Sequence, residues 1–184
     1  MNVLSRKVLA SVDPTKDWGW IESAVRRRLS EDRGVAWHEV KEADGTGWRL
    51  MSAPVASAEA VQGLQTHYET TMRLSSQWVD SPAALLRGDD ELLLVLAGNP
   101  GRAVAPVRDN KPESVSQFLK TAAAAAEALA HVHGAGILHR AIRPSALLED
   151  EAGAVTLTGF IRAVAQDRKS SFPVAFAHAL DDAD

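Results

Sequence analysis

The sequence contains no cysteine among its 184 residues. Disulfide cross-links, thiol redox chemistry and metal centres built on thiolates are therefore excluded. Long hydrophobic runs are also absent, since the longest, LLLVLAG after Glu91, is far shorter than the roughly 20 residues that span a bilayer. The N-terminus carries no apolar signal segment. We therefore expect a cytoplasmic protein with no membrane partner.

A net positive charge is absent as well. The formal net charge is -4, and the only dense basic run is Arg26-Arg27-Arg28. This balance argues against general affinity for nucleic acid. We expect the run to lie on a helix, where its three side chains point in different directions into solvent. With 46% hydrophobic and 24% charged residues, the composition is typical of a soluble globular protein.

The first predicted element is a helix over residues 13–34. Asp13-Pro14 is a good helix start, and Gly34 is a natural stop. The apolar residues between them recur at helical spacing. They are Trp18, Ile21, Val25 and Leu29.

Two hairpins enclose a second predicted helix. Turn residues Asp44-Gly45 divide the β-forming stretch 35–56, and Gly88-Asp89-Asp90 divide the stretch 84–98. Ser57 is a suitable N-cap for the helix between them. Its expected apolar stripe consists of Val61, Leu64, Tyr68 and Met72.

The strongest helical pattern covers residues 112–133. Its apolar residues recur every 3.6 positions around the alanine run 122–126. A short hairpin over 147–158 follows, turning at Asp150–Gly153, and residues 168–184 form a tail without a clear period.

The segment LAHVHGAGILHRAIRPSALLEDEAGAVTLTGF, residues 129–160, resembles the catalytic loop of protein kinases and the turn that follows it. Many positions fall in register with the family pattern: Leu129, His133, Gly136, Ile137, His139, Arg140, Ile142, Pro144, Leu147, Leu148, Leu157, Thr158 and Phe160. The stretch LLLVLAGNPG and its distance from the long helix are most similar to one subgroup. That subgroup is the kinase-like modules at the front of bacterial multidomain sensor histidine kinases.

The positions that carry chemistry in that family are replaced in this sequence. In the family an acidic residue that acts as the base follows the His-Arg pair. Here Ala141 follows His139-Arg140, and Arg143 replaces the family's lysine. The family's two metal ligands are replaced by Ala146 and by Gly159, the first residue of Gly159-Phe160-Ile161. The strand 48–55 lacks the family's lysine, the nearest being Lys41, and the partner glutamate falls near His67 or Glu69.

The resemblance implies an α+β, protein kinase-like fold with a small N-lobe sheet, one helix and a truncated helical C-lobe. We expect an N-terminal helical extension over 1–34, an N-lobe-like sheet and helix over 35–104 and a partial C-lobe over 105–167. A tail over 168–184 completes the chain.

The retained residues shape the loop and the missing ones transfer phosphate, which is the pattern of a pseudokinase. The prediction is therefore a non-enzymatic regulatory or protein-docking module in bacterial signal transduction of the two-component kind, without cofactor or metal. The alternative is a nucleotide or small-molecule sensor that uses the degenerate cleft without turnover; an active atypical kinase is third. We interpret His131, His133 and His139 as structural, and Phe160 as a core residue.

Apolar residues cover more than one face of the predicted helix 112–133, which predicts burial against a partner. Leu119, Ala123 and Ala126 are the expected contacts, joined by Phe172 and Phe176 of the tail. The partner is expected to be another protein, an adjacent signalling domain or a second copy of the chain.

Overall fold

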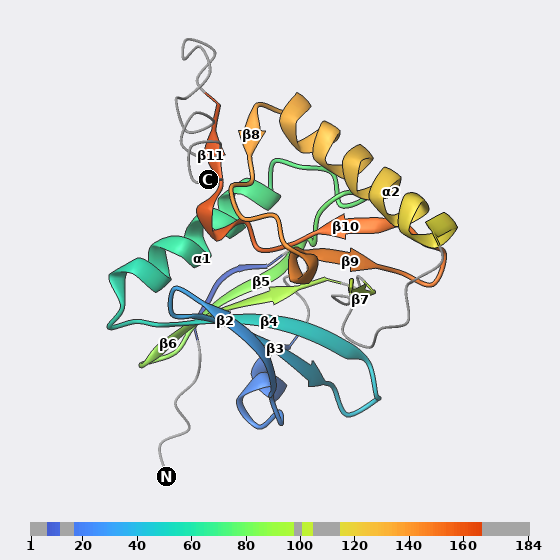
Figure 1. The fold of residues 1–184 in the computed structure, drawn as a ribbon. Coiled ribbons are helices and arrows are strands. Elements are labelled where there is room, and N and C mark those ends of the chain that lie inside the picture. Colours follow the sequence, from blue (N-terminus) through green and yellow to red (C-terminus); the bar gives the residue numbers. More distant parts are fainter. Residues whose placement is uncertain (1–6, 12–16, 98–100, 105–114, 167–184) are drawn as a thin grey trace, which may run out of the picture.

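A six-stranded antiparallel sheet forms the first half of the molecule (Figure 1). The structure is a computed structural model that describes residues 7–11, 17–97, 101–104 and 115–166. Across the sheet the strands follow the order β1-β5-β6-β4-β3-β2. They are β1 (Lys7–Ser11), β2 (Arg27–Asp32), β3 (Val35–Lys41), β4 (Gly47–Pro54), β5 (Pro82–Arg87) and β6 (Glu91–Leu96).

Both predicted hairpins are confirmed. The β3–β4 turn is closed by the Gly45 N–H, which donates to the Glu42 carbonyl at 3.0 Å, and by the Thr46 N–H, which donates to Asp44 Oδ1 at 2.8 Å. In the β5–β6 turn, the Gly88 N–H donates to the Glu91 carbonyl at 2.9 Å. These local bonds set the strand register that the turn residues indicate.

The helix predicted over residues 13–34 is wrong. The described part of that range holds a single 3-10 turn, η1 (Gly19–Glu22), followed by strand β2. Val25 and Leu29, two members of the expected apolar stripe, are 89% and 40% exposed. Arg33 and Gly34, with φ of 50° and 76°, form a two-residue turn, so β2 pairs with β3 as a hairpin and Gly34 turns the chain where a helix stop was expected.

The basic run therefore lies on and beside a strand, not on a helix. Its arginines form ion pairs with Glu91, Glu39 and Glu31. Opposite charges on neighbouring strand positions support the pairing of β2 with β3.

Helix α1 (Ala58–Thr71) covers one face of the sheet. Ser57 caps it as predicted, accepting a hydrogen bond from the Ala60 N–H at 3.3 Å. The buried stripe differs in part from the expected one, because His67 and Thr71 are buried while Met72 is 51% exposed. The opposite face of the sheet packs against η1, where Trp18 and Ile21 are buried.

The second half combines one long helix with short strands: β7 (Arg102–Ala103), α2 (Val115–Gly134), β8 (Ile137–Leu138), η2 (Pro144–Ala146), β9 (Leu147–Glu149), β10 (Val155–Leu157), η3 (Phe160–Arg162) and β11 (Val164–Ala165). Strands β10, β9 and β7 form one small sheet, and β11 pairs with β8. Helix α2 packs on β10, and Ala128 and Val132 are buried there. The fold is thus mixed α+β, as expected. In the described part of the chain, no helix has the length and apolarity needed to cross a membrane.

Candidate functional site

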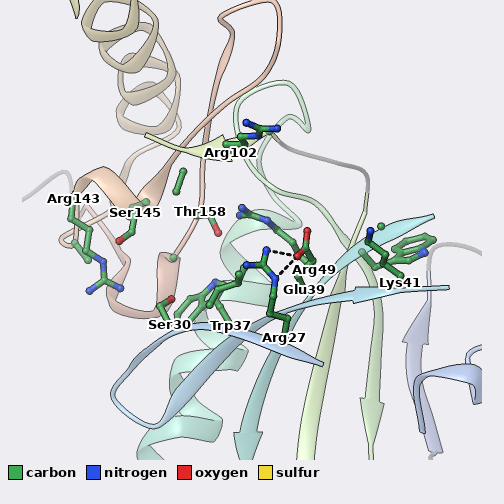
Figure 2. Close-up of a pocket in the computed structure, with 18 of the residues that line it drawn as sticks. Arg27, Ser30, Trp37, Glu39, Lys41, Arg49, Arg102, Arg143, Ser145 and Thr158 are labelled. Atoms are coloured by element: carbon green, nitrogen blue, oxygen red, sulfur yellow. Dashed lines mark hydrogen bonds and ion pairs between the residues drawn. The ribbon is translucent and has the colours of Figure 1, made fainter. Parts of the chain in front are cut away.

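A cavity of about 780 Å³ opens between the large sheet and the loop that precedes β9 (Figure 2). Strands β2, β3 and β4 line one side of it. The short strand β7, the loop segment 141–146 and residues 158–159 line the other. Its volume lies within the range of about 300–1,000 Å³ that is typical of small-molecule sites.

The charged side chains that line this cavity are mostly cationic. Of the described lining residues, five are basic and one is acidic. The basic residues are Arg27, Lys41, Arg49, Arg102 and Arg143, and the acid is Glu39. The chain as a whole has a net charge of -4, so the cavity wall has the opposite sign to the rest of the protein.

Glu39 stands between two arginines in a row across the sheet. It is paired with Arg27 on β2 and with Arg49 on β4. Its Oε2 accepts a hydrogen bond from Arg27 Nε at 2.7 Å, and a second bond comes from Arg27 Nη2. The one carboxylate on the described cavity wall is therefore already engaged.

Arg49 has no such partner. Within the described residues it forms no hydrogen bond and no ion pair, although its side chain is partly buried. Burial lowers the pKa of its guanidinium, while the charges of Asp80 and Glu39 act in the opposite direction. Figure 2 shows Arg49 extending into the cavity between Arg27 and Thr158.

Asp32 at the end of β2 ties the sheet to the loop at one edge of the cavity. Its carboxylate lies 3.3 Å from Arg143 Nη1 and accepts a hydrogen bond from Arg162 Nη2 at 2.7 Å. Arg143 is thus partly neutralised. Among the five cations, the described contacts leave Lys41, Arg49 and Arg102 without an ion pair.

The structure brings together the positions that the family resemblance marks as missing their chemistry. Ala141, Ala146 and Gly159 all lie on the cavity wall, and Arg143 lies beside them. Gly159 adopts a left-handed backbone with φ of 82°. None of the three carries a group that can accept a proton or ligate a metal ion.

Of the other loop residues, Phe160 and His139 are buried and Arg140 is not. Phe160 is fully buried, and His139 is buried with its Nε2 2.8 Å from the Thr158 carbonyl. Arg140 is exposed and has a φ of 61°. His131 stacks on Trp78 with ring centroids 4.2 Å apart, whereas His133 is exposed, so burial does not support the structural interpretation of His133.

A sealed polar network lies behind the loop. The Phe160 N–H donates to His67 Nδ1 at 3.1 Å, so the neutral imidazole carries its proton on Nε2. That nitrogen faces Asp80 Oδ1 at 3.5 Å, and the Thr158 hydroxyl donates to the other oxygen of Asp80. Burial lowers the pKa of His67 to about 3 and raises the pKa of Asp80 to about 7.

Sequence reasoning missed Arg49, Arg102 and Asp80. Arg49 and Arg102 stand on separate strands, and no local pattern joins them to the loop. Asp80 lies two residues before β5, in the polar segment that ends at Pro82, and gave no local signal of its burial. The strand 48–55 lacks the lysine of the kinase family, but Arg49 supplies a cation on the same strand.

The predicted interaction residues are divided between two regions. Leu119, Ala123 and Ala126 are exposed on α2. Phe172 and Phe176 lie outside the described residues. In the parts of the chain that the structure covers, no group of three or more histidine or acidic side chains is arranged to hold a metal ion.

Part of the chain is similar to a known bacterial kinase. The chain is 38% identical over 66 residues to the DNA damage-responsive serine/threonine-protein kinase RqkA of Deinococcus radiodurans. The aligned segment is 36% of this chain and 10% of the relative, so the chain spans only about a tenth of that kinase. No family model matches. The similarity supports a distant kinase-like relationship.

Proposed function

We propose that this chain is a kinase-like signalling module that does not transfer phosphate and acts by regulation or protein docking. One observation carries the proposal: Ala141, Ala146 and Gly159 face the cavity at the positions where the family resemblance places the base and the metal ligands. Phosphoryl transfer relies on a positioned base, metal ions and cations around the phosphates. Of these, the described residues at the loop positions and on the cavity wall supply only the cations.

A phosphotransfer assay tests the proposal. The purified chain is incubated with γ-labelled ATP, magnesium or manganese, and a generic protein substrate. We expect no label on either protein. Ala141→Asp should remain inactive, because it restores the base without the metal ligands. Label transfer by the unaltered chain, at a rate that survives replacement of Asp150 and Glu151, would contradict the proposal.

The docking role rests on the outer face of α2. Phe118 and Leu119 are 58% and 59% exposed, and Ala123 and Ala126 are exposed beside them. Side chains as small as alanine permit close approach of a partner backbone. The partner is an adjacent signalling domain or a second copy of the chain.

Light scattering at micromolar concentration tests this face. Leu119→Glu should abolish self-association or binding to the adjacent domain, whereas Lys120→Glu, one position along the helix, should have a smaller effect. A stable monomer whose properties are unchanged by deletion of residues 168–184 would exclude both the dimer and a docking role for the tail.

A second candidate function is a sensor that binds a small molecule in the cavity without turnover. The volume of the cavity and its unpaired cations favour this role. Docking and sensing are compatible, because the loop that lines the cavity packs through Phe160 against the cluster that includes α2.

A further inference from the structure

We propose that the cavity binds a small phosphorylated anion, of diphosphate size or larger, without a divalent metal, and that Arg49 is its main anchor. This inference rests on the sensor function proposed above and names the class of its ligand. It follows from the charges on the cavity wall, the unpaired state of Arg49 and the directions from which the cations approach.

The first argument concerns charge. Five cations and one carboxylate line the cavity of a protein whose net charge is -4. A hollow with one sign of charge and low-dielectric walls concentrates counter-ions. Glu39 carries a single negative charge and its carboxylate is hydrogen-bonded to Arg27, so most of the positive charge on the wall stays in excess. An anion with more than one charge matches this surplus.

The second argument concerns Arg49. A partly buried guanidinium that forms no hydrogen bond is unfavourable, because it loses hydration that nothing replaces. Within the described residues, Asp80 and Glu39 offset this cost through their charges, but neither forms a hydrogen bond or an ion pair with Arg49. Arg27 lies on the far side of Glu39 in the same cross-strand row and already occupies its carboxylate. A bound anion would supply the missing partner.

The third argument concerns ligand chemistry. The cations come from β2, β3, β4, β7 and the loop before η2, so they surround the hollow. A phosphate group accepts hydrogen bonds through oxygens that point in several directions, and arginine binds it through paired N–H groups. Divalent metals that bridge phosphates need carboxylate ligands, and Glu39 is the only one on the described wall. The arginines therefore take the charge-neutralising role of the metal.

Calorimetric titration of the full chain in EDTA tests the proposal. The probes are tripolyphosphate, pyrophosphate, ATP and the neutral nucleoside adenosine. We expect the first three to bind, adenosine not to bind, and magnesium not to strengthen binding. Affinity should fall as salt is raised, since the contact is ionic.

Two variants identify the site. Arg49→Ala should weaken tripolyphosphate binding about tenfold to a hundredfold, the effect expected from loss of charge-assisted hydrogen bonds. Arg87→Ala, an exposed arginine on β5 outside the cavity, is the matched control and should bind normally. Arg49→Ala should also remain folded, as its thermal unfolding curve will show, because no hydrogen bond or ion pair of the described residues is lost. Arg102→Ala provides a second cavity variant with the same expected direction.

The inference would be overturned by no binding of any phosphate probe, by equal losses in Arg49→Ala and Arg87→Ala, or by binding that requires magnesium. Adenosine binding as tight as tripolyphosphate binding would also overturn it, because the nucleoside carries no phosphate. Phosphate transfer from labelled ATP, measured in the same samples, reports on the inactive-module proposal instead, so the two failures are distinguishable.

Discussion

Polar side chains lie in opposite environments on the two sides of the segment 157–160. Behind it, His67, Asp80 and Thr158 are sealed from solvent and hydrogen-bonded to one another or to backbone. In front of it, the cavity exposes cations that the described contacts leave unpaired. The sealed side joins α1 to the loop and stabilises the fold. The open side contributes little to stability, which is the usual character of a binding surface.

The largest expected effect lies on the sealed side. Phe160 is fully buried and packs near both His67 and His139, with ring centroids 6.0 and 4.3 Å away. Phe160→Ala should lower the free energy of unfolding by about 3–5 kcal/mol in a urea titration. Phe118→Ala, on the exposed face of α2, is the control and should have little effect. An unchanged Phe160→Ala midpoint would show that the Phe160 ring is not part of the core.

A smaller effect is expected where the chain enters the cavity wall. Gly101 has a φ of 90°, and a Cβ added there would lie 2.1 Å from the Glu149 carbonyl oxygen on β9. Gly101→Ala should therefore separate β7 from β9, with a cost near the top of the range of about 1–3 kcal/mol for strained backbone.

Gly45→Ala is the matched control for this substitution. Gly45 has a φ of 89° but open space around it, so the substitution adds backbone strain without a clash. Thermal unfolding of both variants separates the cost of backbone strain from the cost of the clash with β9. Equal losses of stability would show that the close approach of Gly101 to β9 does not matter.

The smallest effect concerns pH and tests the sealed network. Asp80, with its pKa raised to about 7, retains a proton in the folded state that it loses when unfolded, so its contribution to stability falls from about pH 4 to pH 7. His67, with its pKa lowered to about 3, binds a proton only when unfolded, so its contribution rises from about pH 3 to pH 6.5. The two slopes oppose each other between about pH 4 and pH 6.5.

Single substitutions should reveal how the contribution of each residue to stability depends on pH, because the two contributions cancel in the unaltered chain. Relative to the unaltered chain, Asp80→Asn should gain stability as pH rises through this window, and His67→Gln should lose it. Each slope is at most about 1.4 kcal/mol per pH unit, the value for one proton. Denaturant titrations at several pH values measure the difference. Parallel curves for all three proteins would show that the pair does not exchange protons on unfolding.

Local patterns predicted many of the elements correctly. Turn residues located both hairpins, Ser57 located the start of α1, and the 3.6-residue spacing located α2 over Val115–Gly134. The replaced positions Ala141, Ala146 and Gly159 were identified from the sequence alone, and the fold places them together on one wall. Such features depend on neighbours within a few residues, where sequence carries the information.

Local patterns failed in two ways. Trp18, Ile21, Val25 and Leu29 have helical spacing, but Arg33-Gly34 is the turn of a hairpin, and β3 supplies the hydrogen bonds of β2 and the Glu39 carboxylate. In α1, His67 is buried in place of an apolar residue because the Phe160 N–H, 93 residues away, is its partner. The first signal was local and was misread, whereas the second partner is not visible in a window of one helix.

The sequence by itself determined which side chains the loop lacks, since no fold can supply a carboxylate at Ala141 or Gly159. Only the tertiary structure decided what stands in their place. Strands and a loop that are far apart in the chain bring Arg27, Arg49, Arg102 and Arg143 around one hollow. Their charges act together only because folding shortens the distances between them, and Coulomb energy depends on distance through space and not along the chain.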